Sequence, residues 1–164
     1  MWFLHRKVLL TINLIKRNWT GSTKCCFCDQ DETIQHLFIE CPLAWVIWRI
    51  VHIAFNITPP SSITNLFGNW LNGVGKRDKT QIRVGVCALL WAIWHVQNDY
   101  VFNKAKNTSF MQVIPLATHW IRMWSYLQSE DQKRVTDIGC NRLETVVQEF
   151  FTRFGWRCAN RIAC

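Results

Sequence analysis

The stretch CCFCDQDETIQHLFIECPLAW, residues 25–45, decides how the N-terminal part of the chain folds. It contains Cys25-x2-Cys28, a pair that supplies two thiolates from one tight turn, which is a common half of a tetrahedral zinc site. His36 and Cys41 supply the second pair of ligands, and the stretch therefore predicts a zinc site.

The spacing between His36 and Cys41 needs a local explanation. Along one continuous α-helix, five residues turn the side chain through about 140°, which would point the two ligands apart. Pro42 removes this difficulty because the residue before a proline is disfavoured in the helical region. Cys41 is then free to turn back toward the metal and to stand at the start of the next helix, where the helix dipole favours a thiolate.

Folding energetics favour a bound metal over a loop that is merely rich in cysteine. Ordering residues 25–41 costs about 1–2 kcal/mol per residue in backbone entropy, and the segment has few large apolar side chains to offset that cost. A structural zinc ion contributes about 10–16 kcal/mol. We therefore expect one structural Zn²⁺; the alternative is a cluster of buried, reduced cysteines. Cys26 is a fifth thiol, and Cys25 is preferred over it because a two-residue spacer to Cys28 is the better-known ligand spacing.

Composition narrows the class of protein. The chain has 164 residues, 49% of them hydrophobic, with 7 Gly and 4 Pro, which favours helices over a sandwich or barrel of short strands. The longest apolar run, residues 84–96, is shorter than the roughly 20 residues that cross a bilayer. No signal peptide is visible. We expect an intracellular protein, in nucleus or cytoplasm, that does not bind a membrane.

Apolar periodicity predicts the helices. A first helical stretch covers residues 3–15, and Pro42 starts a second helix with so many apolar residues that we expect it to be covered on two sides. Further helices are expected from Ile82 to about Asn103, from Met111 to Trp124 after a Thr108 or Ser109 cap, and from Leu143 to near Gly155. Six tryptophans fall at helical spacings and are expected in the core: Trp45, Trp48, Trp91, Trp94, Trp120 and Trp124.

These elements predict a mainly α fold. A small zinc-knuckle-like CCHC site lies between short helices and is followed by a helical hairpin and a C-terminal helix. Three regions are expected: a zinc-binding domain over 1–58, a linker rich in Pro, Gly and charged residues over 59–80, and a helical region over 81–164.

The same segment resembles a known family. FLHRKVLLT (3–11), LIKRNW (14–19), CCFC (25–28) and ETIQHLFIECPLA (32–44), closing on Trp48, are similar to the zinc-binding domain that follows reverse transcriptase in plant non-LTR (LINE-type) retrotransposons. The resemblance implies that the zinc ligands are Cys25, Cys28, His36 and Cys41. The later WAIW (91–94), with ND (98–99) and FN (102–103), is similar to a downstream tail of such elements, more loosely.

The chain lacks the polymerase of that family, and we interpret it as a C-terminal fragment. Reverse transcription needs paired carboxylates that hold two metal ions, and no such Asp-Asp pair occurs here. Cys87 and His95 lie about two helical turns apart, too far for a nucleophile and its base on one helix. We expect no enzymatic activity and no small-molecule substrate.

Charge indicates where a nucleic acid would bind. The net charge is +8, yet residues 25–41 carry four acids and no Lys or Arg, so an RNA or DNA partner is expected to contact the basic segment before them. The candidate contacts are Arg6, Lys7, Lys16, Arg17, Trp19, Lys24 and Phe27. Trp19 either stacks on a base or packs against the metal loop, and Phe27 either stacks on a base or fills the small core beneath the metal.

Two functions from different classes follow. The first is a zinc-stabilised nucleic-acid-binding module derived from a retrotransposon polyprotein. The second is a zinc-stabilised structural or protein-interaction domain, or a retroelement remnant without a cellular function. Salt dependence separates them, because phosphate binding through several Lys and Arg weakens steeply as salt rises.

Overall fold

The computed structural model describes residues 11–15, 18–103 and 112–154, which form helices joined by turns. No β-strand occurs in these ranges; the only ladder pairing there is an isolated bridge between Lys24 and Asp31. The expected mainly α fold is confirmed. Its elements are α1 (Thr11–Ile15), the π-helical turn η1 (His36–Glu40), α2 (Pro42–Phe55), α3 (Ile63–Phe67), α4 (Lys76–Asn103), α5 (Val113–Ser125) and α6 (Glu130–Phe154).

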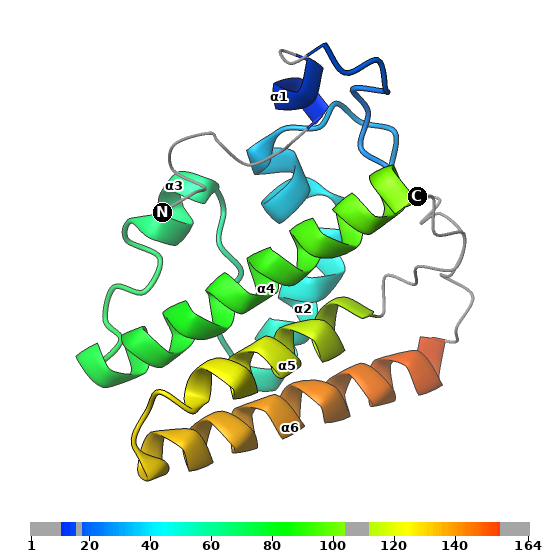
Figure 1. The fold of residues 1–164 in the computed structure, drawn as a ribbon. Coiled ribbons are helices and arrows are strands. Elements are labelled where there is room, and N and C mark those ends of the chain that lie inside the picture. The colour runs from blue at the N-terminus through cyan, green and yellow to red at the C-terminus, as the bar shows by residue number, and fades with distance from the viewer. Residues whose placement is uncertain (1–10, 16–17, 104–111, 155–164) are drawn as a thin grey trace.

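The three longest elements of the C-terminal half run side by side, up, down and up (Figure 1). α4 packs along α5 and α5 along α6, whereas α2 crosses behind them and contacts α6 and η1. The Cys/His segment lies at the C-terminal end of α4, against which η1 packs. No helix in the described ranges combines the length and apolar character that crossing a membrane requires.

The start and the end of α2 follow from local sequence. Pro42 occupies the first turn, where its missing N–H costs nothing, as expected from the sequence. Asn56 ends the helix in the left-handed conformation (φ 54°), which Asn tolerates better than most residues. The expectation that both tryptophans of this helix are buried is half wrong: Trp48 is 3% exposed, but Trp45 is 63% exposed because no element among the described residues covers that side of α2.

The helical hairpin is longer than the apolar pattern indicated. α4 is described from Lys76 to Asn103, and its start takes in charged residues that the sequence assigned to the linker. α3 also lies within residues 59–80, with the Ser62 hydroxyl accepting a hydrogen bond from the Asn65 N–H. α5 begins at Val113, and the expected caps Thr108 and Ser109 lie outside the described residues.

The largest correction concerns α6. It was expected from Leu143, but it begins at Glu130. Its first half is mostly polar and contains Gly139, so apolar periodicity did not reveal it. The narrow stripe of Thr136, Cys140 and Leu143, at i, i+4 and i+7, is nevertheless buried. Tertiary packing on α5, rather than intrinsic propensity, therefore explains this half of the helix.

Candidate metal centre

The first two cysteines stand on a tight hairpin. Lys24 and Asp31 face each other across it, and their side chains form an ion pair of 2.6 Å. The Cys25 N–H donates to the Gln30 carbonyl (2.7 Å), and the Asp29 N–H donates to the Cys25 carbonyl (3.1 Å). Asp29 takes a left-handed conformation (φ 61°), which reverses the chain directly after Cys28.

The second pair of ligands is brought together by a π turn, which the sequence did not predict. The Cys41 N–H donates to the His36 carbonyl (2.7 Å), so the ring closes at the fifth residue and returns Cys41 to the side of His36. Cys41 itself is extended (φ −58°, ψ 138°) and stands at the N-cap of α2. The expected exit of Cys41 from helical geometry before Pro42 is thus observed, with the π turn supplying the rest of the convergence.

The four side chains meet in one place. The ligand atoms of Cys25, Cys28, His36 and Cys41 all lie within 4.8 Å of one another. The sulfurs of Cys25 and Cys41 are 3.8 Å apart, and the Cys28 sulfur lies 3.1 Å from His36 Nε2. The first distance is far longer than the roughly 2.05 Å of a disulfide. It matches the edge of about 3.8 Å that two Zn–S bonds of about 2.3 Å make in a tetrahedron, so this donor set fits one zinc ion.

The electrostatics of the cluster favour a cation at its centre. The pKa of the Cys25 thiol is lowered from 9.0 to about 5, first because the Cys41 thiol donates a hydrogen bond to it. The same hydrogen bond, together with burial, raises the pKa of Cys41, and burial raises the pKa of Cys28. The crowded thiols therefore cannot all lose their protons unless a positive charge lies among them. A divalent metal bound among them stabilises the thiolates together.

Cys26 is excluded from this group. Its sulfur is not among the four converging ligand atoms, and burial raises the pKa of its thiol. Cys25 and Cys41 are 1% and 0% exposed, and His36 is 8% exposed, so the cluster is closed on most sides. A closed Cys/His cluster is typical of a structural zinc site, whereas a catalytic zinc ion keeps an open position.

Two contacts that the sequence did not reveal hold the cluster in place. The indole N–H of Trp48, on α2, donates to the Phe38 carbonyl inside η1 (2.8 Å). The side chain of Gln97, on α4, donates to the carboxylate of Glu32 (2.8 Å), and both residues are 2% exposed or less. Glu32 and Gln97 are 65 residues apart in sequence, which is why no local pattern pointed to this pair.

The candidate nucleic-acid contacts have different surroundings. Phe27 is 2% exposed, with its ring 6.5 Å from that of Tyr100, so it fills the core beside the metal ligands and is not available to stack on a base. Trp19 is half-buried; its ring lies against the backbone of Gly21, where any Cβ would collide with it, and 6.3 Å from the ring of Phe102. Lys24 is exposed but paired with Asp31. Arg6, Lys7, Lys16 and Arg17 lie outside the described residues.

Other groups with potential chemistry are scattered. Cys87 is exposed on α4 and Cys140 is buried on α6, while Cys158 and Cys164 lie outside the described residues. His95 pairs with Asp99 on the same helix at 3.0 Å. Within the described ranges, the Cys/His group is the one cluster of His, Cys, Asp or Glu side chains able to hold a metal ion.

A helical module with a closed Cys₃His cluster near its N-terminus belongs to the class of zinc-stabilised small domains. Residues 1–48 match the model of a protein family described as zinc-binding in reverse transcriptase. This match and the cluster geometry agree on one zinc ion as the cofactor of this region. The matched residues are fewer than a third of the 164 in the chain. Comparison with curated proteins and with solved structures gave no match.

Proposed function

We propose that the chain is a zinc-stabilised module that binds nucleic acid, with the zinc ion held by Cys25, Cys28, His36 and Cys41. The observation that carries the zinc part is the convergence of these four ligand atoms within 4.8 Å. We further propose that the module derives from the polyprotein of a LINE-type retrotransposon of plants and catalyses no reaction itself. The family match over residues 1–48 supports this origin.

Charge distribution supports nucleic acid as the partner. The surface around the metal carries Asp29 and Glu40, which repel phosphate, while Asp31 is paired with Lys24. By contrast, the first two turns of α4 carry Lys76, Arg77, Lys79 and Arg83. Among the described residues none of these four forms an ion pair, and all but the half-buried Lys79 are exposed. We call these four residues the α4 basic cluster; it is the described surface best suited to a phosphate backbone.

A charge-matched titration tests the proposal. Binding of the zinc-loaded chain to labelled single-stranded RNA, single-stranded DNA and duplex DNA is measured over a series of salt concentrations. We expect log K to fall linearly with log salt, and the variant Lys76→Ala/Arg77→Ala/Arg83→Ala to reduce that slope by about 2–3. The control variant Arg134→Ala/Arg142→Ala/Arg153→Ala removes the same charge from exposed positions of α6 and should change the slope less.

A protein-interaction role is the second candidate, and exposed apolar side chains favour it. Trp45 and Ile53 are 63% and 51% exposed on α2, and Tyr126 and Leu127 are 68% and 90% exposed after α5. If nucleic-acid binding is absent or independent of salt, this reading replaces the first. The variant Trp45→Ala/Ile53→Ala, which leaves the zinc ligands intact, should then abolish association with a protein partner.

A further inference from the structure

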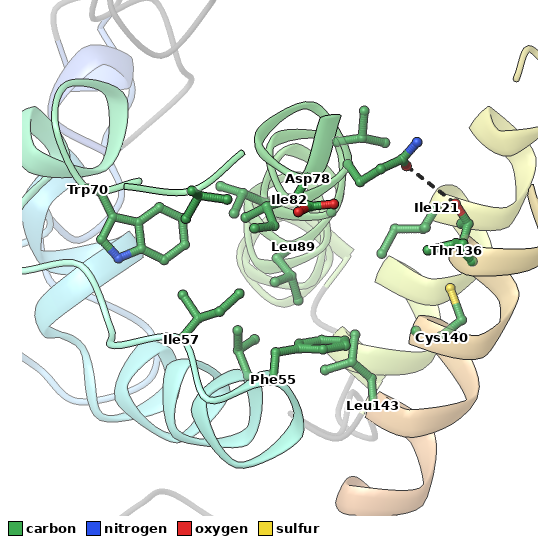
Figure 2. A pocket seen from close by; sticks show the side chains of 18 residues that line it. Phe55, Ile57, Trp70, Asp78, Ile82, Leu89, Ile121, Thr136, Cys140 and Leu143 are labelled. Atoms are coloured by element: carbon green, nitrogen blue, oxygen red, sulfur yellow. Dashed lines mark hydrogen bonds between the residues drawn. The ribbon is translucent and has the colours of Figure 1, made fainter. Parts of the chain in front are cut away.

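An apolar cavity of about 450 Å³ lies between α2, α4 and α6, and Lys76, Arg77, Lys79 and Arg83 of the α4 basic cluster are not among the residues that line it. Figure 2 looks into it: Trp70 and Ile57 form the wall on the left, Phe55 and Leu143 lie below, and Ile121 and Thr136 stand on the right. A volume of this size falls in the range of roughly 300–1,000 Å³ that is typical of small-molecule sites.

The cavity exists because two helices that border it make little direct contact. α2 packs on α6 and η1, and α4 packs on α5, so α2 and α4 are held apart by their other neighbours. Trp70 fixes the wall between them, since its indole N–H donates to the Thr58 carbonyl (2.7 Å) and its ring meets that of Trp48 edge-on at 5.6 Å.

Two glycines enlarge the cavity from facing helices. Gly85 lies in the interior of α4 and Gly139 in the interior of α6, positions where Gly is less favourable than Ala. A Cβ at Gly85 would lie 3.9 Å from the nearest atom of Ile121, and one at Gly139 would lie 3.8 Å from the ring of Phe55. Both are ordinary contact distances, so helix packing does not require glycine at either position. An alanine at either position would reduce the volume of the cavity.

The polar groups of the cavity point to the charge of its ligand. The Thr136 hydroxyl donates a hydrogen bond to the side-chain oxygen of Gln81 (3.4 Å), so these two groups do not need a hydrogen bond from a ligand. Asp78 is the one charged residue of the lining, and it is exposed at the opening. No hydrogen bond or ion pair to another described residue involves its carboxylate.

We propose that this cavity binds a small apolar molecule carrying one cationic amine, with the apolar body between Phe55, Trp70 and Ile82 and the ammonium group beside Asp78, one turn of α4 from Ile82. The carboxylate selects a cation over an anion of the same shape, and the apolar aromatic and aliphatic lining holds the body. The sequence analysis predicted no small-molecule substrate; the proposal concerns a bound ligand and adds no reaction. It uses neither the zinc ligands nor the cationic side chains of the α4 basic cluster, none of which line the cavity, although Asp78 lies between Arg77 and Lys79 in the first turn of α4.

The test uses three probes with one apolar cage: 1-aminoadamantane, 1-adamantanol and 1-adamantanecarboxylate. Each is titrated into the zinc-loaded full chain by isothermal calorimetry. We expect saturable binding with the order amine, alcohol, carboxylate. Asp78→Asn should weaken the amine about fivefold, the size of an exposed ion pair, and leave the alcohol unchanged. Asp131→Asn, in the first turn of α6 as Asp78 is in the first turn of α4, is the matched control and should change nothing.

A cavity-filling variant locates the site. Gly139→Leu should abolish binding of all three probes, and Gly85→Ala/Gly139→Ala, which fits without collision, should weaken them if the leucine variant does not fold. Zinc content and nucleic-acid affinity should stay unchanged in both variants. Equal affinity for the three probes, no saturable binding up to their solubility limits, or affinities that the alanine pair leaves unchanged overturn the proposal. So does a dimer of the wild-type chain that the alanine pair dissociates, since a second copy would then be the occupant.

Discussion

The metal region, residues 24–41, and the helical layer of α4, α5 and α6 are stabilised in different ways. In the metal region, short hydrogen bonds and four converging ligand atoms fix a loop that has little regular structure. In the helical layer, apolar side chains such as Leu90, Ile93 and Ala117 are completely buried between long helices, yet a cavity of about 450 Å³ remains beside them.

The difference shows that metal coordination and apolar burial place different demands on the geometry of one small chain. Coordination needs each ligand atom at one place, so the metal region has no tolerance for displacement. Burial of apolar area is non-directional, so the helices can pack well on one side and leave space on the other. The two regions should therefore respond differently to substitution.

Removal of a metal ligand should have the largest effect. Cys41→Ser takes away one of four ligands of an ion worth about 10–16 kcal/mol to folding, so we expect zinc to fall from about one ion per chain to nearly none. Hydrogen exchange should then show loss of protection over residues 24–41 while α5 and α6 stay protected. Cys26→Ser is the control and should keep its zinc; equal loss in both variants would contradict the assignment of Cys25 over Cys26.

Removal of the link between the two regions should come next. Gln97→Leu deprives the buried carboxylate of Glu32 of a donor, which we expect to cost about 1–3 kcal/mol in urea unfolding of the zinc-loaded chain. The other atom of the Gln97 amide, Oε1, is buried without a hydrogen bond, and its removal offsets part of that cost. Gln148→Leu, at an exposed position of α6, should be close to neutral.

Filling part of the cavity between the helices should change the free energy of unfolding less than the Gln97 substitution does, and in the opposite direction. Gly85→Ala and Gly139→Ala should each raise the free energy of unfolding by about 0.5–1 kcal/mol, because Ala is the better helix former and fits at both positions. Gly73→Ala should instead destabilise, since Gly73 has φ +89°. Thermal unfolding of the three variants checks the sign. Destabilisation by both helix substitutions would contradict the free space for a Cβ at Gly85 and Gly139.

The smallest effect concerns an ion pair that joins α5 to α6. The Arg122 guanidinium donates two hydrogen bonds to the Glu144 carboxylate (2.6 and 3.0 Å). These bonds lower the pKa of the Glu144 carboxyl below 4.5. A depressed pKa contributes stability above the unfolded-state value and loses it as pH falls through the folded-state value. Because both side chains are about one-third exposed, we expect Glu144→Gln to cost no more than about 1 kcal/mol at pH 7.

This cost should shrink as pH falls below 4.5. Urea unfolding at pH 7 and pH 3.5 measures it as the difference between variant and wild type, so that zinc release at low pH cancels. Glu149→Gln, exposed on the same helix, is the control. A cost of Glu144→Gln that is equal at both pH values would contradict the role of the ion pair.

Much of this molecule could be predicted from sequence where the determinants are local. Pro42 indicated both the start of α2 and the extended conformation of Cys41, because proline restricts the residue before it. The Cys-x2-Cys pair and its downstream ligands indicated the metal site from spacing alone. The first half of α6 could not be predicted because its polar residues and Gly139 give no apolar periodicity. The exposure of Trp45 could not be predicted because it depends on which other helices pack against α2.

The sequence by itself determined the kind of metal, the ligand types and the helical character, because these depend on residue chemistry and short spacings. Only the tertiary structure decided the π turn that brings Cys41 beside His36, the buried pair of Glu32 and Gln97, and the cavity between α2 and α4. Each of the last two joins segments far apart in the chain, and the π turn closes at a spacing that helical periodicity does not anticipate. Their geometry follows from how whole helices pack, which no short stretch of sequence specifies.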